Sequence, residues 1–383
     1  MSKIISVNAG SSSLKFQLFE MDDETVITSG VIERIGLEDS IFTIKYNGEK
    51  DVTTLPIENH KVAVQLLLDT LIKKEIVKDL DEIKGVGHRV VQGGAYFDQS
   101  VIIDDDVVAK IDELKSLAPL HNPAHLTGYY AFKEAIPNAG AVAVFDTAFH
   151  QTLEPKSYIY PIPYKYYVEN KVRKYGAHGT SHFYVSSRCR EMMGNPKHSR
   201  IIVAHLGAGG SLTAVKDGKS INTSMGFTPL AGIMMGTRSG DVDPSVIDYL
   251  IEEVGLDMKE VIKMLNKESG LLGVSGVSSD RAQLALDIFF RRVIAYIGRY
   301  FIALGGVDAI CFTAGIGENS FFARKEICNL LAEALGIEID DDANVNGKGD
   351  RLISTPNSKV KVYVIPTNEE LVIARDTKRL LNL

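Results

Sequence analysis

Short apolar runs flank two glycine- and serine-rich turns of the chain. Residues 3–7 and 14–20 enclose the first turn, and residues 201–206 and 211–216 enclose the second. β-Branched and aromatic residues on both sides of a tight turn predict a β-hairpin. The second turn is one residue longer, and the copies lie roughly half a chain apart. We interpret them as an internal repeat and expect two similar domains, each opening with a strand, a turn and a returning strand.

Strand and helix patterns alternate around these hairpins. A helical pattern over residues 62–74 precedes a β-rich run over 83–91, which predicts α/β layering. The acidic, Asn/Gly-rich stretch 340–350 predicts a surface loop before a strand over 360–365. Capping side chains predict two further helices, one from Thr180 or Ser181 to Gly194 and one from Asn319 or Ser320 to Gly336.

Composition narrows the class of protein. The 383 residues are 45% hydrophobic and 24% charged, which is typical of a soluble globular chain long enough for two domains. The net charge of −7 and the lack of a Lys/Arg-dense block argue against nucleic-acid binding. No apolar run approaches the ~20 residues of a membrane span, and the N-terminus has no signal-peptide pattern. Three widely spaced cysteines, Cys189, Cys311 and Cys328, read as buried thiols. We therefore expect a cytoplasmic protein.

The first turn carries phosphate-binding chemistry. In Asn8–Lys15, the glycine allows close backbone approach, three serines offer hydroxyl donors and Lys15 supplies charge. A tight hairpin rich in turn formers is the alternative. The spacing differs from that of the P-loop. Recurrence at 207–211 favours the phosphate reading, because two such turns facing each other would form a clamp.

A third glycine-rich element follows an apolar run. Residues 312–320 join a predicted strand, over 307–312, to the start of a helix. Such a strand, turn and helix N-terminus favours a nucleotide. A compact strand-to-helix turn remains the alternative.

Two arginines and one acid stand out as candidates for phosphoryl or carboxylate chemistry. Arg89 and Arg238 lie among small residues, where a guanidinium can present a forked pair of donors. Asp146 follows an apolar run, and open α/β sheets place functional groups at strand ends. Surface ion pairing for the arginines, and turn capping for Asp146, stay open.

Histidines and acids offer two candidate metal sites. His178 and His182 are four residues apart, but the glutamate of the zinc motif is missing, so contact with phosphate oxygens or a structural role is favoured. Glu369 and Glu370 follow a predicted strand and suit Mg²⁺ bound together with phosphates. The alternative is that both are acids at the start of a helix, where they interact favourably with the helix macrodipole.

Together these segments resemble acetate kinases over nearly the whole chain. The matching motifs occur in the family's order: NAGSSSLK, GHRVV, FDTAFH, HGTSH, MGTRSGD, FTAGIGENS and PTNEE. The resemblance implies the fold shared by acetate and sugar kinases, the heat-shock chaperone ATPase and actin. Two duplicated α/β domains of this ribonuclease H-like class close on ATP in an interdomain cleft. By this resemblance the domains are 1–148 plus 371–383, and 149–370.

The resemblance also implies roles for individual residues in the transfer of the ATP γ-phosphate to acetate, giving acetyl phosphate and ADP. Asp146 is the active-site acid that positions substrate and metal, without removing a proton, since a carboxylate is already a nucleophile. His178 and Arg238 stabilise the transition state, and Arg89 binds substrate. Asn8 and Glu369 hold Mg²⁺, or Mn²⁺ in its place, directly or through water. The methyl pocket would be lined by Val91, Leu120, Ala177 and Pro229, and the nucleotide would be contacted by Lys15, His205, Leu206, Gly207, Ala208, Gly209, Asp280, Gly315, Ile316, Gly317, Glu318 and Asn319.

Three departures from the family's pattern affect these expectations. Ala177 replaces an aromatic residue, which leaves room for propionate or butyrate. Burial of each additional CH₂ group of these substrates would favour binding by about 0.8 kcal/mol. Ala208 replaces a common Asn and loses one side-chain donor. Asp280 runs directly into Arg281, so a nucleotide-contacting segment is absent, either by deletion or because residues are missing from the chain.

Other functions remain open at this point. An ATP-driven interaction protein of the chaperone or actin type would use the same fold, but would not need two arginines and a histidine at a second substrate. A metal-dependent hydrolase would use His150, His178 and His182. Propionate or butyrate kinase is the alternative within the kinase class. The family resemblance implies a homodimer.

Overall fold

The chain folds into two compact units. The computed structural model describes residues 2–119, 121–276 and 279–383. Unit 1 comprises residues 1–148 and 368–383, and unit 2 comprises residues 149–367. The sequence placed the return to the first domain at residue 371. In the structure it begins at Asn368, because the Asn368 side chain caps helix α14 (Glu369–Leu381) by accepting from the Leu371 amide at 3.1 Å.

Unit 1 is built on an eight-stranded sheet with the order β5-β4-β3-β2-β1-β6-β8-β7. Each pair of neighbours among β1 to β5 is antiparallel, whereas β6 is parallel to both β1 and β8. The hairpin and the strand predicted over 83–91 are therefore confirmed. The bounds are β1 (Lys3–Gly10), β2 (Ser13–Glu20), β3 (Thr25–Glu33), β4 (Ser40–Tyr46), β5 (Glu49–Leu55), β6 (Ile83–Val90), β7 (Val101–Ile102) and β8 (Gly140–Phe145).

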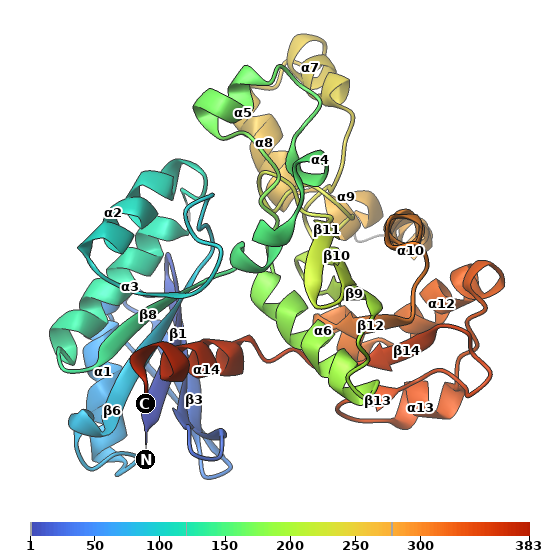
Figure 1. Ribbon diagram of the computed structural model, residues 1–383. Coiled ribbons are helices and arrows are strands. Elements are labelled where there is room, and N and C mark those ends of the chain that lie inside the picture. The colour runs from blue at the N-terminus through green and yellow to red at the C-terminus, as the bar shows by residue number, and fades with distance from the viewer. Residues whose placement is uncertain (1, 120, 277–278) are drawn as a thin grey trace. The chain divides into compact units, whose positions relative to one another are not determined.

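Helices cover both faces of this sheet (Figure 1). The helix α1 (His60–Lys73), predicted from the pattern over 62–74, packs its buried leucines with α3 (Asn122–Ala135) against β1 and β6. On the opposite face, Gly85 and Gly87 of β6 let α14 approach closely, since a Cβ at Gly87 would lie 2.4 Å from Ile373. The unit also contains α2 (Asp105–Glu113) and the short 3-10 turns at Leu80–Glu82 and Leu114–Ser116.

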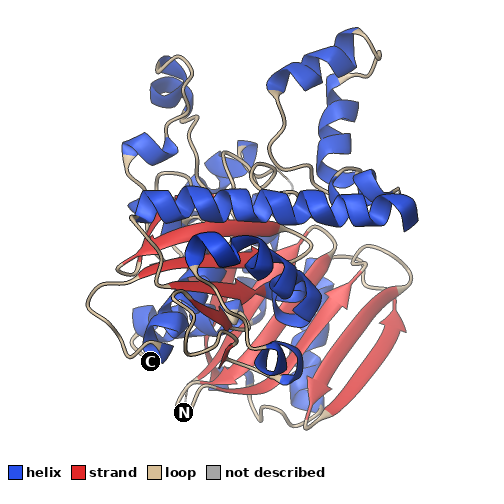
Figure 2. Ribbon diagram, turned by 90° about the vertical axis from the view of Figure 1, so that its right-hand side faces the viewer, coloured by secondary structure: helices blue, strands red, loops and turns tan. Residues whose placement is uncertain are grey.

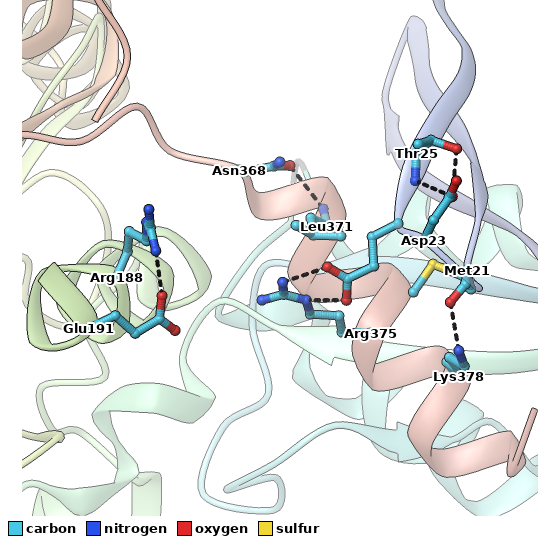
Figure 3. Close-up of polar contacts among 10 residues, drawn as sticks. Met21, Asp23, Thr25, Arg188, Glu191, Asn368, Leu371, Arg375 and Lys378 are labelled. Carbon is cyan, nitrogen blue, oxygen red and sulfur yellow. Dashed lines mark hydrogen bonds and ion pairs between the residues drawn. The ribbon is translucent and has the colours of Figure 1, made fainter. Parts of the chain in front are cut away.

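Polar contacts fasten α14 to the N-terminal part of unit 1 (Figure 3). Arg375 forms a forked ion pair with Glu24 at 2.7 and 2.6 Å. Lys378 donates to the Met21 carbonyl at 2.6 Å. These contacts join the last helix to the loop between β2 and β3, so the C-terminal segment completes the fold that the N-terminus begins.

Unit 2 repeats the strand arrangement of unit 1. Its six-stranded sheet has the order β11-β10-β9-β12-β14-β13. As in unit 1, the first strand pairs antiparallel with its hairpin partner and parallel with a later strand, which is itself parallel to the next. The predicted duplication is visible in this shared order. The bounds are β9 (Arg200–Leu206), β10 (Gly210–Lys216), β11 (Lys219–Thr223), β12 (Ala309–Thr313), β13 (Arg351–Leu352) and β14 (Lys361–Val364).

The two faces of the second sheet are buried by different helices. Alternate residues of β9 and β12, including Ile202 and Ile310, pack against α10 (Ser279–Leu304) and α12 (Phe321–Leu335). Figure 2 shows the long helix α10 lying across its sheet. The residues of opposite parity, including Val203 and Cys311, pack against α6 (Gly179–Met192). Further helices are α4 (Pro155–Tyr158), α5 (Lys165–Asn170), α7 (Pro244–Glu252), α8 (Met258–Lys267), α9 (Gly270–Ser275), α11 (Ala314–Asn319) and α13 (Asp341–Asn346), with a 3-10 turn at Ala148–Thr152.

Two local predictions were wrong in part. Neither Thr180 nor Ser181 caps α6, because the helix already begins at Gly179 after His178 and the Ser181 hydroxyl contacts His205 instead. The segment 340–350 is not all loop, because Asp340 accepts from the Ala343 amide and starts α13. The Ser320 cap and the Gly336 end of α12 are confirmed.

Two further expectations concern the cysteines and membrane-spanning segments. The three cysteines are free and buried, as predicted. Within the described ranges, no helix combines the length and the apolar character needed to cross a bilayer.

Candidate active site

The hairpin of unit 1 brings Asn8 and Lys15 side by side. These residues occupy opposed positions on β1 and β2, and Gly10 pairs with Ser13, so the turn contains only Ser11 and Ser12. A Cβ at Gly10 would lie 2.7 Å from the Ser13 hydroxyl, which explains the glycine. The turn therefore offers a tight backbone with an amide and an ammonium side chain at its base.

Arg89 and Asp146 form a forked ion pair in unit 1. The Arg89 Nε donates to Oδ1 at 3.0 Å and Nη2 donates to Oδ2 at 2.6 Å. The pair forms because β6 and β8 are parallel neighbours and the Asp146 amide bonds to Val90 at 2.9 Å as β8 ends. Asp146 is 1% exposed. Although burial acts against it, the Asp146 and Glu369 carboxylates raise the pKa of Arg89, so the guanidinium stays charged.

A small pocket of unit 1 gathers the predicted polar residues. Its lining includes Asn8, Lys15, Arg89 and Glu369, together with Ser6, Val7, Glu370 and Ile373. The Ser6 hydroxyl is buried and has no hydrogen-bond partner among the described residues. The pocket thus combines two cations, two carboxylates and neutral oxygens.

Glu369 has an unusual proton affinity in this pocket. Burial raises its pKa to about 7, and the Asp146 and Glu370 carboxylates act in the same direction, while Arg89 and Lys15 oppose them. The carboxyl group therefore binds a proton or a cation readily near neutral pH. A carboxylate surrounded by other carboxylates is also a suitable cation ligand.

The hairpin of unit 2 carries the second glycine turn. Leu206 pairs with Gly210, so Gly207, Ala208 and Gly209 form a three-residue turn, one residue longer than the first, as predicted. A Cβ at Gly207 would lie 3.5 Å from Ala314 and 3.9 Å from the Gly315 amide. The turn consequently lies beside the start of α11, and the second and third glycine-rich elements are neighbours.

His178 projects at this turn from a strained position. It precedes α6 with φ of 57°, a left-handed conformation that is uncommon for residues other than glycine. Its Nδ1 lies 2.9 Å from the Ser211 hydroxyl, and its ring stacks on His205 at 4.1 Å between centroids. The strain and these contacts fix the direction of the imidazole.

Arg238 meets His178 over Gly209. The position of a Gly209 Cβ lies 3.3 Å from Arg238 Nη1 and 3.6 Å from His178 Nε2. Arg238 also donates to the Pro229 carbonyl at 3.2 Å. A guanidinium, an imidazole edge and the glycine turn therefore converge on one small volume, which suits a phosphoryl group.

The third glycine element is held by two polar side chains. Glu318 accepts from the Ala314 amide at 2.8 Å and from the Thr367 amide at 3.2 Å, tying the turn to the end of unit 2. Arg324 is fully buried and donates to the Gly317 and Glu318 carbonyls at 3.0 and 2.8 Å. The segment that was predicted to contact nucleotide, Gly315, Ile316, Gly317, Glu318 and Asn319, lies in the short helix α11.

The predicted methyl pocket is described only in part. Val91 is buried directly after β6, and Ala177 is buried with Met225 and Met235. Leu120 and the side chain of Asp280 lie outside the described residues. The roles assigned to these residues stay predictions.

The histidines do not form a metal centre. His150 uses both ring nitrogens, with Nδ1 2.9 Å from the Ser220 hydroxyl and Nε2 3.0 Å from the Ala177 carbonyl. His182 contacts Ser211 at 2.7 Å and is wholly buried, which supports its structural interpretation. Over the described ranges, no three or more His, Cys, Asp or Glu side chains are grouped to hold a metal. The hydrolase alternative therefore has no geometric support.

Several contributing residues were not predicted. Ser211 bridges two histidines, Ser6 lines the pocket of unit 1, and Arg324 holds α11. Ser211 lies in the strand after the second turn, and the parallel with the first turn was the signal that could have marked it. No local pattern identifies Arg324, because its partners Gly317 and Asn344 are separated along the chain.

Comparison with known proteins identifies the family of this chain. The model of the acetokinase family matches residues 3–375. The acetate kinase of Geobacillus sp. (strain WCH70) is 54% identical over 398 positions, which cover 100% of both chains. The acetate kinase of Bacillus subtilis (strain 168) is 54% identical over 395 positions, which cover 99% of this chain and 100% of the relative.

Solved structures show the same fold. The Porphyromonas gingivalis acetate kinase has a TM-score of 0.94 at 43% identity, with all of both chains covered. A Francisella tularensis propionate kinase has a TM-score of 0.93 at 42% identity, covering 99% of this chain and 100% of that chain. The predicted fold class, two α/β domains of the actin-like type, is confirmed. From the family match and these relatives, we conclude that the chain belongs to the acetokinase family.

Proposed function

We propose that this protein transfers the γ-phosphate of ATP reversibly to acetate, giving acetyl phosphate and ADP. The observation that carries the proposal is the convergence of His178 and Arg238 over Gly209 in a member of the acetokinase family. A chaperone- or actin-type switch would need to bind ATP but would not need this second set of donors. The geometry therefore favours a phosphotransferase.

The acetate carboxylate acts as the nucleophile in this proposal. One carboxylate oxygen attacks the γ-phosphorus, the bond to the ADP oxygen breaks, and no proton has to be removed. Charge accumulates on the three equatorial phosphoryl oxygens. His178 and Arg238 donate to these oxygens, while Arg89, held by Asp146, binds the carboxylate in line with the bond that breaks.

Mg²⁺ fits the pocket of unit 1. Asn8 and Glu369 provide hard oxygen atoms, and the buried Ser6 hydroxyl has no partner among the described residues. Mg²⁺ usually binds through one or two carboxylates together with water and phosphate oxygens. Asn8 and Glu369 would hold the ion directly or through water, and Mn²⁺ could replace it. When bound, the ion neutralises charge on the phosphates.

The nucleotide phosphates belong to the two glycine turns and to α11. Lys15 and the backbone from His205 to Gly209 would contact the phosphate chain, and the segment 315–319 would lie under the nucleoside. Because Ala208 carries no side-chain donor, the backbone amides supply the hydrogen bonds of the second turn. The 398-position alignment with the first Geobacillus relative exceeds the 383 residues of this chain, so the relative has positions that this chain lacks. We assign this shortfall to the join at Asp280.

An assay of acyl phosphate formation tests the proposal. The purified protein is incubated with ATP, Mg²⁺ and acetate, and acetyl phosphate is trapped with hydroxylamine. We expect the hydroxamate and ADP to form in equal amounts, and the hydroxamate to disappear when acetate is omitted. ATP hydrolysis that does not respond to any carboxylate would contradict the proposal.

Propionate is a second candidate substrate, because Ala177 stands where the family usually has a larger, aromatic residue. The Francisella relative is named a propionate kinase, and the methionines around Ala177 are flexible enough to admit a longer chain. We expect Ala177→Phe to lower kcat/KM for propionate and butyrate more than for acetate. A strong acetate preference that is the same with and without this substitution would exclude a role for Ala177.

A homodimer is the proposed assembly. Apolar side chains are exposed along α7 and its surroundings, and α7 has no buried residue. The exposed set comprises Val242, Val246, Tyr249, Val254, Met258 and Ile262, joined by Ile162, Tyr164, Tyr166 and Val168 near α5. Exposed apolar side chains at this density mark an interface. Sedimentation should show a dimer that Tyr249→Asp dissociates and that Ile302→Asp, on α10, leaves intact. We also infer residence in the cytoplasm, where buried free thiols persist.

A further inference from the structure

Ser211 is shared by two histidines of unit 2. It lies in β10, is fully buried, and faces His205 across the hairpin. Its hydroxyl oxygen is 2.9 Å from His178 Nδ1 and 2.7 Å from His182 Nε2. A hydroxyl group has one proton and two acceptor lone pairs. It can therefore donate to only one of the two rings at a time, and the other ring must donate to it.

His182 decides which ring receives the proton of Ser211. Its side chain is fully buried, and burial lowers its pKa well below the ordinary value, so the ring is neutral and carries one N–H. Its Nδ1 has no hydrogen-bond partner in the described part of the chain. A proton on Nδ1 would be a buried N–H without an acceptor, an arrangement that folded proteins rarely tolerate. The proton of His182 therefore belongs on Nε2, where it is donated to Ser211.

The remaining hydrogen bond of Ser211 then determines the tautomer of His178. Since the Ser211 oxygen accepts from His182, its own proton is available to Nδ1 of His178. A neutral His178 that accepts at Nδ1 carries its proton on Nε2. This Nε2 is the atom 3.6 Å from the Gly209 Cβ position, on the side where Arg238 Nη1 also lies.

We propose that Ser211 is a positioning residue that holds His178 in the tautomer with the proton on Nε2, by accepting a hydrogen bond from His182 and donating one to His178. The relay runs from a buried, neutral imidazole through one hydroxyl to the imidazole at the glycine turn. A neutral His178 in this tautomer donates a hydrogen bond toward the phosphoryl position. Its catalytic consequence rests on the proposed function, whereas the tautomer itself does not.

Nitrogen-15 NMR of the histidine rings tests the relay directly, because the two ring nitrogens of a neutral imidazole have distinct shifts when one is protonated. The full-length protein is labelled at histidine, and His178 is assigned by its loss in His178→Gln. We expect a protonated Nε2 and an unprotonated Nδ1. A proton on Nδ1 of His178 in the unmodified protein would overturn the proposal, and this result needs no variant of Ser211 or His182.

Three substitutions separate the relay from general packing. Ser211→Ala should move part of the His178 population to the Nδ1–H tautomer. His182→Gln should preserve the Nε2–H tautomer, because a glutamine amide can still donate to Ser211. Ser181→Ala is the matched control, since it removes a buried serine hydroxyl 2.8 Å from His205 Nδ1 in the same cluster and leaves Ser211 in place. Its His178 signals should not change.

Kinetics complete the test. Ser211→Ala should lower kcat by roughly 10-fold, the effect expected when one transition-state hydrogen bond is weakened, with little change in KM for ATP or the carboxylate. His182→Gln should retain more activity than Ser211→Ala. An unchanged His178 tautomer in Ser211→Ala would overturn the relay. If the protein has no carboxylate kinase activity but shows the Nε2–H tautomer, the proposed function fails and the relay stands.

Discussion

The Arg89 guanidinium and the Asp146 carboxylate share two hydrogen bonds, at 3.0 and 2.6 Å, at the ends of two parallel strands. Asp146 engages Nε and Nη2 of Arg89, and in the proposed reaction Nη1 would be the atom that faces the substrate. In the proposed reaction Asp146 supports the arginine and removes no proton, which agrees with the chemistry of a carboxylate nucleophile.

Asp146→Asn should impair catalysis and also lower the stability of the fold. The amide keeps the shape of the side chain but loses the charge and one acceptor, so Arg89 loses one of its two hydrogen bonds and its orientation. Truncating a buried charge pair costs about 2–5 kcal/mol, and we expect kcat/KM for acetate to fall by at least ~30-fold. The measurement is steady-state kinetics with varied acetate.

Asp39→Asn provides the matched control for this prediction. Arg34 and Asp39 also form a forked pair, with distances of 3.2 and 2.6 Å, but both side chains are exposed. Exposed pairs contribute little, so this variant should resemble the unmodified protein. Equal losses in the two variants would show that the buried pair has no special part in the reaction.

Gly209→Ala should obstruct the phosphoryl site. The added methyl group would lie 3.3 Å from Arg238 Nη1 and 3.6 Å from His178 Nε2, in the volume where we place the phosphoryl oxygens. We expect kcat to fall by at least ~10-fold, with the midpoint of thermal unfolding nearly unchanged.

Gly298→Ala tests whether any glycine substitution has this effect. Gly298 lies within α10, and apart from its chain neighbours and the nearby backbone of its own helix, no atom of the described residues lies within 4 Å of its Cβ position. Replacing a helical glycine by alanine should stabilise the protein by about 0.5–1 kcal/mol without changing kcat. If Gly209→Ala were as active as Gly298→Ala, the phosphoryl group would have to lie elsewhere.

Arg324→Lys should loosen α11. Besides the Gly317 and Glu318 carbonyls, the guanidinium donates to Asn344 Oδ1 at 2.7 Å and to its carbonyl at 2.6 Å. Burial lowers the pKa of Arg324 to about 10. A lysine ammonium cannot reach all four acceptors, so we expect a loss of about 3 kcal/mol in the free energy of unfolding. We also expect KM for ATP to rise more than KM for acetate.

The half-buried Arg351 supplies the comparison for Arg324. It donates to the Ala343 and Gly349 carbonyls at 3.1 and 3.0 Å, away from α11. Arg351→Lys should change stability less and leave KM for ATP unaltered. A KM for ATP that is unchanged in Arg324→Lys as well would separate α11 from nucleotide binding.

Buried histidines should make the protein sensitive to acid. Burial lowers the pKa of His88 and His125 to about 3 and that of His150 to about 4, against about 6.5 in the unfolded chain. Below pH 6.5 the unfolded state binds more protons, so their contribution to stability is complete above that pH and is lost as the pH falls toward 3–4. Glu369 acts with the opposite sign, because its pKa of about 7 makes its contribution decline as the pH rises from about 4.5 to 7.

Denaturant unfolding between pH 4 and 6 measures this effect. His88→Leu should reduce the slope of the unfolding free energy by about one proton, ~1.4 kcal/mol per pH unit. His198→Leu is the comparison variant, because it removes a histidine whose side chain is exposed. The account of buried neutral histidines would be wrong if the two variants had the same slope.

Much of the fold could be predicted from short-range patterns. The two hairpins, the strand after 83 and the helix that ends at Gly336 follow from local periodicity and from turn and cap residues, and the structure confirms them. The cap at Ser181 was predicted wrongly because its side chain has a distant partner, His205, that outcompetes the local role. The same reason hid α13, where Asn344 is anchored by Arg324 from another helix.

The candidate site was predicted less completely than the fold. Motifs identified Arg238 and His178, which the structure brings together near Gly209 and which we propose to face the substrate. They did not identify Ser211, whose importance depends on two histidines meeting at one hydroxyl. Such support is set by tertiary contacts, and a one-dimensional pattern does not contain it.

Oxygen labelling tests the central claim most directly. Acetate labelled with ¹⁸O in its carboxyl group is incubated with ATP, Mg²⁺ and the protein, and the acetyl phosphate is analysed by ³¹P NMR. If the acetate carboxylate attacks the γ-phosphorus, the oxygen that bridges carbon and phosphorus carries the label. Unlabelled phosphate released at the same rate with or without acetate would contradict carboxylate phosphorylation.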